Sequence, residues 1–281
     1  MAKKIAVVNM KGGVGKTTLA VNLACFYAYQ FPRPMKVLLV DLDPQFNASQ
    51  YVLGQHRYKA ILDENKPTIW HIFEQNTRTP AGKVGPVLAT DVVHRISGSG
   101  EKVLDLIPSR LELALSLKNP GQKERFLAKT LRPLNDGYDI ILIDCAPTES
   151  VLTTAAYLAA DHLLVPVRPE YLSTIGLQLL VQSMQDFKEE YSDHDLSLAG
   201  VVFNANSEYV PEEARAKQEV LALATAHKWH VFDNSIKYSR SYPKGAREGR
   251  AIQHTSYARS TTWQPFFDFA YEFSRRIGLS W

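Results

Sequence analysis

A glycine-rich loop near the N-terminus connects an apolar stretch to a sequence that starts a helix. Residues 11–18 read Lys-Gly-Gly-Val-Gly-Lys-Thr-Thr, and the mainly apolar residues 4–10 lead directly into them. Closely spaced glycines let the backbone fold tightly, so that successive N–H groups can point at phosphate oxygens. The order of strand, glycine loop and helix therefore predicts a nucleoside triphosphate site. A plain strand–helix turn would not require Lys-Thr-Thr after the last glycine.

The side chains of this loop have separate expected tasks. Lys16 is placed to reach the β- and γ-phosphates, and the hydroxyl of Thr17 is placed to ligate Mg²⁺. The predicted nucleotide-binding residues of the loop are Lys11, Gly12, Gly13, Val14, Gly15, Lys16, Thr17 and Thr18.

Two continuous apolar runs end in carboxylates, at residues 37–43 and 138–144. Such runs are typical of strands buried on both faces of a parallel sheet, which binds ligands at the carboxyl ends of its strands. Asp41 and Asp43 would point the same way, because side chains alternate along a strand. Asp144 suits the Walker B role of holding Mg²⁺. A solvated strand end is the alternative for each carboxylate taken alone.

Together these runs predict a single α/β P-loop domain over 1–281, with a mostly parallel sheet covered by helices on both faces. The length of 281 residues is sufficient for one such domain with a substantial core.

The glycine loop departs from the usual form G-x-x-x-x-G-K-[ST], because Met10 stands at the first glycine position and Lys11 follows it. Residues 41–45 read Asp-Leu-Asp-Pro-Gln, and the second apolar run ends at Asp144. This combination resembles the deviant Walker A P-loop of the ParA/MinD group of ATPases, and most closely the Soj-like ParA partition ATPases. Phe46 differs from that pattern, which usually has glycine there.

The resemblance implies ATP and Mg²⁺ as cofactors. Lys11 would reach across a dimer to the partner's nucleotide, and Asp43, supported by Asp41, would position the attacking water. Asn204, at the end of an apolar stretch, would contact the nucleobase. The implied catalytic residues are Lys11, Lys16 and Asp43, and the implied metal site consists of Thr17, Asp43 and Asp144.

Positive charge gathers toward the C-terminus, although the net charge of the chain is only +3. Residues 236–281 contain eight Lys or Arg against three Asp or Glu. A basic, flexible segment at 236–260 with interspersed tyrosines suits DNA phosphates, and a solvated loop face is an equally good interpretation from the residues alone. The candidate DNA contacts are Lys237, Arg240, Lys244, Arg247, Arg250 and Arg259.

An apolar stripe that includes Phe266 and Phe273 has helical spacing and predicts a terminal helix at 262–278. We interpret it as a helix that closes the core, with a membrane-surface helix of the MinD kind as the alternative. Pro and Gly residues at 76–103 predict a loop or hairpin insertion. Cys25 and Cys145 are expected to be small core residues.

The resemblance also implies a function. It suggests a homodimer with ATP that binds non-specific double-stranded DNA and positions a plasmid, chromosome or protein assembly with a ParB-like or cargo adaptor protein. The first predicted strand starts at residue 4, without the helix-turn-helix domain of larger partition ATPases, so DNA binding should not depend on sequence. Hydrolysis would be slow until a partner stimulates it, and the location would be the cytoplasm and nucleoid. The membrane is an unexpected partner, because no run of 18 apolar residues occurs and the polar face of the terminal helix is acidic as well as basic.

Three other classes of protein remain as alternatives. A MinD-like membrane-cycling regulator should bind anionic vesicles with ATP and ignore DNA. A metabolic P-loop enzyme should act on a small-molecule acceptor. A tyrosine autokinase is disfavoured, because residues 257–281 contain only Tyr257 and Tyr271.

Overall fold

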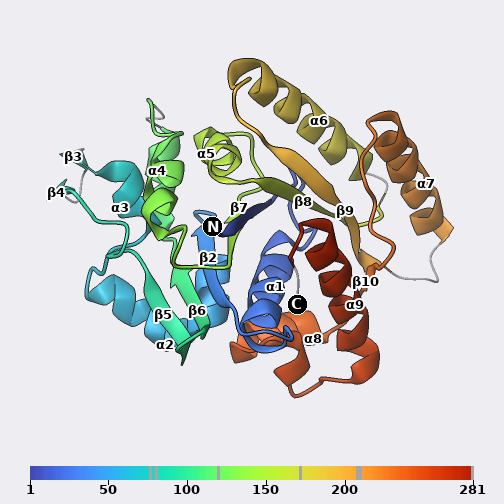
Figure 1. The fold of residues 1–281 in the computed structure, drawn as a ribbon, viewed down its shortest axis with the longest axis horizontal. Coiled ribbons are helices and arrows are strands. Elements are labelled where there is room, and N and C mark those ends of the chain that lie inside the picture. Colours follow the sequence, from blue (N-terminus) through green and yellow to red (C-terminus); the bar gives the residue numbers. More distant parts are fainter. Residues whose placement is uncertain (76–77, 80–81, 119–120, 171–172, 207–210, 280–281) are drawn as a thin grey trace.

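The centre of the molecule is an eight-stranded sheet with the order β10-β9-β8-β1-β7-β2-β6-β5 (Figure 1). The structure is a computed structural model that describes residues 1–75, 78–79, 82–118, 121–170, 173–206 and 211–279. The neighbouring strands pair in parallel except for β5, which runs antiparallel to β6. The predicted fold class is therefore confirmed. The strands are β1 (Lys3–Val7), β2 (Lys36–Leu42), β5 (His94–Ser99), β6 (Lys102–Ile107), β7 (Ile140–Cys145), β8 (His162–Val167), β9 (Ser197–Asn206) and β10 (Ile236–Lys237).

Helices cover both faces of this sheet. One face is packed by α1 (Lys16–Tyr29), α2 (Asn47–Asp63), α8 (Ser241–Glu248) and α9 (Ser260–Arg276). The other face is packed by α3 (Ile69–Glu74), α4 (Phe126–Leu131), α5 (Val151–Ala159), α6 (Ser173–Glu190) and α7 (Pro211–Ala226). Short 3-10 segments are η1 (Leu111–Leu117), η2 (Arg132–Leu134) and η3 (Ile252–His254).

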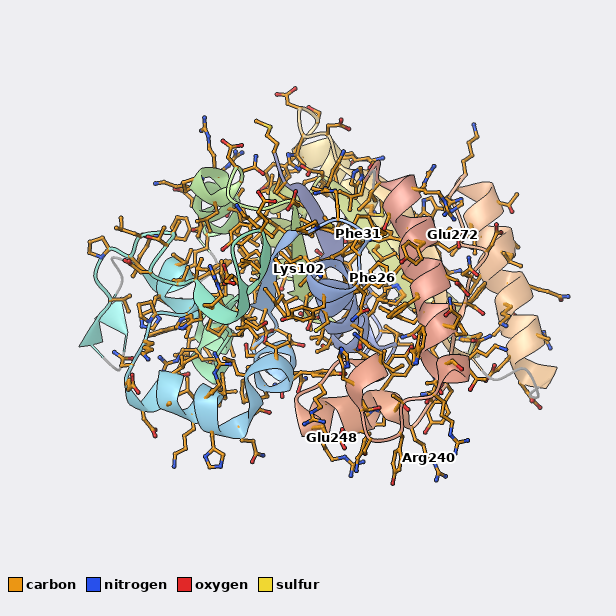
Figure 2. The ribbon with its side chains drawn as sticks, turned by 60° about the horizontal axis from the view of Figure 1, so that its bottom comes forward. Phe26, Phe31, Lys102, Arg240, Glu248 and Glu272 are labelled. Atoms are coloured by element: carbon orange, nitrogen blue, oxygen red, sulfur yellow. The ribbon has the colours of Figure 1, made fainter. Side chains whose placement is uncertain are left out.

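The helix α9 closes the core against α1. The apolar stripe that includes Phe266 and Phe273 is buried. Phe26, which Figure 2 labels on α1, meets two rings of α9 edge-on. The centroid distances are 5.0 Å to Phe267 and 5.1 Å to Tyr271. The interpretation of the C-terminal stripe as a core helix is confirmed, with bounds two residues earlier than expected. Among the described residues, no helix combines the length and apolarity that a membrane crossing requires.

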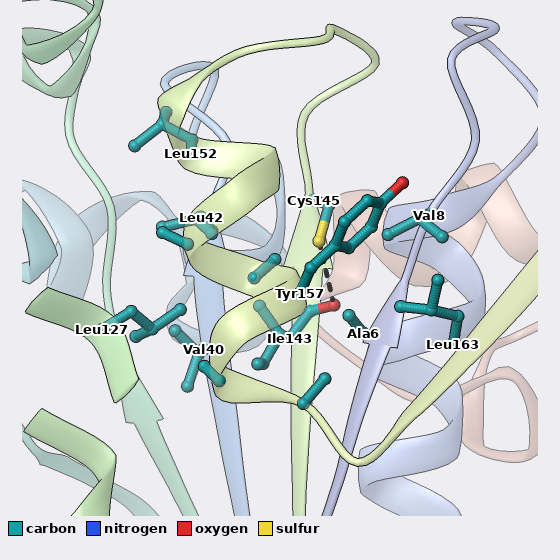
Figure 3. Close-up of a cluster of buried hydrophobic side chains, with 14 of the residues drawn as sticks. Ala6, Val8, Val40, Leu42, Leu127, Ile143, Cys145, Leu152, Tyr157 and Leu163 are labelled. Carbon is teal, nitrogen blue, oxygen red and sulfur yellow. Dashed lines mark hydrogen bonds between the residues drawn. The ribbon is translucent and has the colours of Figure 1, made fainter. Parts of the chain in front are cut away.

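Side chains of the central strands alternate between the two helical layers, as the period of a strand requires. Ala6, Val40 and Ile143 belong to the cluster beneath α4 and α5 (Figure 3). Ile5 and Leu142, one position along, belong to the cluster beneath α1 and α9. Both faces of these strands are therefore core, which explains their continuous apolar sequences.

The strand register brings the ends of three strands together. β7 lies between β1 and β2, and Asp144 pairs with Val7 on one side and with Asp41 on the other. The carboxyl ends of these strands thus form one edge, and the predicted phosphate loop and both carboxylate segments leave the sheet there.

Residues 76–103 are more regular than predicted. β3 (Arg78–Thr79) and β4 (Gly82–Lys83) form a short hairpin, and residues 94–103 belong to the main sheet. The prediction of a hairpin is therefore confirmed for β5 and β6, which pair antiparallel, but this hairpin belongs to the main sheet rather than standing outside it. Gly100, with φ of 62°, starts the tight turn between β5 and β6, and Gly98, with φ of 92°, lies in β5 just before it, so the Gly/Ser cluster marks a hairpin turn. Residues 76–77 and 80–81 lie outside the described residues.

The basic segment at 236–260 also differs from its prediction as flexible chain. It contains β10, α8 and η3. Gly245 of α8 packs so closely on α2 that a Cβ there would lie 2.6 Å from the hydroxyl of Tyr51. The charged residues of this segment are therefore carried on ordered backbone.

Candidate nucleotide site

The glycine loop connects β1 to α1 at the carboxyl edge of the sheet. Gly13 and Gly15 have φ of 77° and 91°, in the left-handed region that glycine adopts readily. Gly12 and Gly13 are exposed, and α1 begins at Lys16. The N-terminal N–H groups of α1 have no partners within the helix and are available to an anion. The predicted order of strand, loop and helix is confirmed.

Asn204 lies directly beneath this loop. Its side chain is buried, and Nδ2 donates a hydrogen bond of 2.7 Å to the carbonyl oxygen of Val14. A Cβ at Gly15 would lie only 2.2 Å from the same Nδ2. The end of β9 therefore braces the loop, a role that the sequence did not indicate. Contact of Asn204 with a nucleobase stays a prediction.

The amine of Lys16 lies inside the loop. The residue is buried, and Nζ donates to the carbonyl oxygens of Asn9 and Lys11 at 2.9 and 3.1 Å. Burial lowers the pKa of Lys16, whereas the nearby charge of Asp144 raises it. These contacts hold a cation at the centre of the loop, where a phosphate group would offer it a stronger partner.

Asp144 is a fully buried carboxylate at the end of β7. Neither carboxylate oxygen receives a hydrogen bond of normal geometry from the described residues. Burial, followed by the charge of Asp41, raises the pKa of Asp144 well above its ordinary range, and the nearby Thr17 hydroxyl lowers it. An unpaired buried carboxylate is costly, and a hard divalent cation is a suitable partner for it. The predicted pair of Thr17 and Asp144 therefore fits Mg²⁺.

Asp41 holds the end of β2 to the start of α2. One carboxylate oxygen accepts hydrogen bonds from the N–H and hydroxyl of Ser49 at 2.7 and 2.6 Å, and the other accepts from the N–H of Asp43 at 3.2 Å. Burial raises the pKa of Asp41 to about 7 despite these bonds. The supporting position expected for Asp41 agrees with this network.

Asp43 is buried at the same edge and accepts a hydrogen bond of 2.8 Å from the N–H of Gln45. It therefore shapes the turn that leads into α2. Its action on water and on the metal stays a prediction.

Phe46 occupies the left-handed region, with φ of 48° and ψ of 28°. Its ring stacks on Tyr58 at a centroid distance of 5.2 Å and an interplanar angle of 16°. A left-handed conformation costs a residue with a Cβ about 1–2 kcal/mol. The chain thus keeps a turn that suits glycine and fixes it with an aromatic stack.

Substitution of Phe46 tests this account of the turn. Phe46→Val should lower the free energy of unfolding by about 2 kcal/mol or more, because a β-branched residue tolerates the left-handed region poorly and the stack is lost. Phe46→Gly should change it by about 1 kcal/mol or less, because the relief of strain offsets the lost stack. Urea denaturation of both variants measures the difference. Equal losses would contradict the strained turn.

Lys11 contacts a carboxylate of its own chain. Its Nζ forms an ion pair of 2.9 Å with Oε2 of Glu170, just beyond β8. Nothing in the sequence marked Glu170 as part of the site. The contact joins segments that only the fold brings together.

A cavity of about 320 Å³ adjoins the start of α1. It is lined by Thr17, Thr18, Asn47, Gln50, Tyr51 and Ala246. The first two residues belong to the predicted nucleotide loop, and Ala246 belongs to α8 of the basic segment. The nucleotide loop, α2 and the basic segment therefore share one cavity, which the sequence did not predict.

The six candidate DNA residues lie on or beside β10, α8 and the start of α9. All except Lys244 are exposed. Lys244 pairs with Glu248 at 3.4 Å and lies 4.9 Å from the centroid of the Tyr257 ring. Arg240 and Glu248 mark this side of α8 in Figure 2. The structure brings these residues to one region, and DNA contact by them stays a prediction.

Comparison with known proteins agrees with this site. Residues 2–198 match a family model described as an AAA domain. The chain is 34% identical over 259 residues to the chromosome-partitioning ATPase Soj of Treponema pallidum, covering 90% of this chain and 88% of that protein. An ATP complex of McdA from Cyanothece has a TM-score of 0.77 at 22% identity, covering 100% of this chain and 98% of the other.

A third similar protein is the cobyrinic acid a,c-diamide synthase of Mycobacterium smegmatis, solved with ADP and magnesium. Its TM-score is 0.68 at 25% identity, and the match covers 90% of this chain and 91% of that one. McdA and this biosynthetic enzyme therefore share the fold of the chain. The match to Soj, at 34% identity over 90% of this chain, decides to which family the chain belongs. The chain belongs to the ParA-like P-loop ATPases of the AAA-domain family.

Proposed function

We propose that this ATPase is a nucleotide-dependent dimer that binds DNA without sequence preference and positions a cargo. The observation that carries the proposal is the cavity that Thr17 and Thr18 share with Ala246. Nucleotide at the loop would contact or adjoin the helix that carries part of the basic surface. A change in nucleotide can then alter the position of α8, and with it the affinity for phosphates.

The residues of the loop supply the chemistry of hydrolysis. Mg²⁺, when bound, would supply positive charge against the phosphate groups. Asp144 and Thr17 would hold that ion, and Lys16 would stabilise charge on the β- and γ-phosphates. Asp43 would orient the attacking water, with Asp41 fixing the strand end behind it. Lys11 of a second copy would complete the site, so that hydrolysis requires the dimer.

Exposed apolar residues beside Lys11 support the dimer. Ile175 and Leu179, one turn apart on α6, have 54% and 57% of their surface exposed. Gly176, between them, lies against the loop, since a Cβ there would be 3.1 Å from the Cβ of Lys11. A second copy whose nucleotide receives Lys11 would cover this face of α6.

The partner that stimulates hydrolysis would be a ParB-like or cargo adaptor protein, and the cargo a plasmid, chromosome or protein assembly. Soj is named as a chromosome-partitioning ATPase, which supports this class of cargo. Turnover without the partner would be slow, because a switch must persist until it is triggered. The protein would be cytoplasmic and associated with the nucleoid. A MinD-like membrane cycle is less consistent with the burial of the stripe on α9.

A binding assay with random-sequence duplex DNA and anionic vesicles tests the proposal. With ATP we expect DNA binding that weakens steeply with salt, and with ADP or with the Lys11→Ala variant we expect little binding. Reversing Arg247 and Arg250 to Glu should weaken DNA binding by about tenfold or more and reduce the salt slope by about two.

Arg215→Glu provides the control for that charge reversal. Arg215 is 82% exposed and lies on α7, on the opposite face of the sheet. Its substitution should change DNA affinity by about twofold or less, because it lies away from the basic segment. Vesicle binding without DNA binding would move the protein to the MinD-like class. Equal losses of DNA affinity in the Arg247/Arg250 double variant and in Arg215→Glu would exclude α8 as the DNA surface.

A further inference from the structure

Lys11 is held within its own chain by a carboxylate that has a second cationic partner. Its Nζ lies 2.9 Å from Oε2 of Glu170, and the other oxygen of Glu170 lies 2.7 Å from Nε of Arg168. The hydrogen bond from Lys11, and then the charge of Arg168, keep the pKa of Glu170 below its ordinary range. One carboxylate therefore joins the two cations.

The backbone around Lys11 is fixed in the same place. The side-chain oxygen of Asn9 accepts a hydrogen bond of 2.8 Å from the N–H of Lys11, and Nδ2 of Asn9 donates to the carbonyl of Pro166 at 2.9 Å. These bonds tie the head of the glycine loop to the end of β8, and the turn beyond that strand carries Glu170. Gly176 of α6 also packs against Lys11, since a Cβ at this glycine would lie 3.1 Å from the Cβ of Lys11. These contacts therefore fix where Lys11 and Glu170 meet.

We propose that Glu170 restrains Lys11 in the monomer and so raises the protein concentration at which the ATP dimer forms. The inference rests on the proposed function, in which Lys11 reaches the nucleotide of a second copy. Binding of Lys11 to a phosphate across the dimer interface would draw its ammonium group away from the 2.9 Å contact with Glu170. Glu170 is a positioning residue that competes with the partner's nucleotide for the same ammonium group.

The contact is weak enough to be exchanged. The side chains of Lys11 and Glu170 are 22% and 42% exposed, so solvent screens their attraction. Release of Lys11 also leaves Glu170 beside Arg168, and the carboxylate keeps a cationic partner. A triphosphate offers the amine several charged oxygens. The pair therefore sets a threshold for dimerisation without preventing it.

Glu170→Gln tests the restraint, with sedimentation as the measurement. The dissociation constant of the ATP dimer should fall by roughly three- to tenfold, since each of the two lysines loses one partly exposed ion pair. The thermal midpoint should stay within a few degrees of the wild type. Glu64→Gln is the matched control, because it removes an exposed pair of 2.8 Å with Lys66 at the end of α2. It should leave the dimer unchanged.

The outcomes separate the restraint from the proposed function. A wild-type protein that dimerises with ATP, together with a Glu170→Gln variant that dimerises equally or less well, overturns the restraint alone. A tighter dimer in Glu170→Gln but not in Glu64→Gln supports it. Dimerisation of Glu170→Gln where the wild type stays monomeric supports both. If both stay monomeric at every concentration with ATP, the restraint and the dimeric switch are overturned together.

Discussion

Asp144→Asn is expected to abolish Mg²⁺-dependent ATP hydrolysis and to stabilise the nucleotide-free protein. The buried carboxylate receives no hydrogen bond of normal geometry from the described residues. Without a cation, such a group costs about 1–3 kcal/mol, and an amide of the same shape removes its charge. With Mg²⁺ and ATP the same carboxylate is a ligand, so its loss should slow hydrolysis by about 100-fold or more.

Denaturation between about pH 4 and pH 8 measures the stability part of this prediction. Burial raises the folded-state pKa of Asp144, and raises that of Asp41 to about 7, above the unfolded value near 4. Across this window the unfolded chain binds fewer protons than the folded chain. The free energy of unfolding contributed by the two protonated carboxyl groups is therefore full at low pH and is lost as pH rises. Asp144→Asn should flatten this decline, as should Mg²⁺ with ATP in the wild type.

Asp63→Asn, at the exposed end of α2, is the control for Asp144→Asn. It should change neither hydrolysis nor the pH dependence of stability. Normal hydrolysis by Asp144→Asn, or lower stability without nucleotide, would contradict the assignment of this carboxylate to the metal.

Gly15→Ala is expected to lower the free energy of unfolding by about 2–5 kcal/mol and to abolish ATP binding. The φ of 91° is strained for any residue with a Cβ, and the new methyl group would lie 2.2 Å from Nδ2 of Asn204. Gly12→Ala is the matched control, because no atom lies within 4 Å of the position its Cβ would occupy. It should cost about 0.5 kcal/mol or less in the nucleotide-free protein.

Asn204→Ala separates the two causes of this loss. Added to Gly15→Ala, it removes the collision but not the strained φ, so a part of the lost stability should return. Urea denaturation of the single and double variants measures the coupling between the two residues. Purely additive losses would show that Asn204 does not brace the loop.

The parts of the fold that the sequence predicted are encoded over short stretches. Lys16 and Thr17 follow their glycines directly, and Asp144 ends an apolar run, so adjacent residues define both the strand and its chemistry. The spacing of Phe266 and Phe273 was likewise sufficient for the core helix. These features needed no knowledge of distant segments.

The parts that the sequence did not predict depend on contacts between distant segments. Glu170 and Lys11 meet only because β8 ends beside the glycine loop. Asn204 braces that loop because β9 ends beneath it. The hairpin of β5 and β6 was predicted as a possibility, but not its place in the main sheet, because a Gly/Ser turn between two short strands resembles an inserted loop in sequence.

The place of β1 in the sheet governs the order in which the chain can assemble during synthesis. β1 is made first, yet its neighbours β7 and β8 come from residues 140–145 and 162–167. Pairing between such distant segments closes long loops and is slow. A nascent chain therefore cannot complete the nucleotide loop until β8 has left the ribosome, and α1 keeps an uncovered apolar face until α9 follows. Nucleotide can stabilise only a nearly finished chain, and chaperones are expected to shield α1 before then.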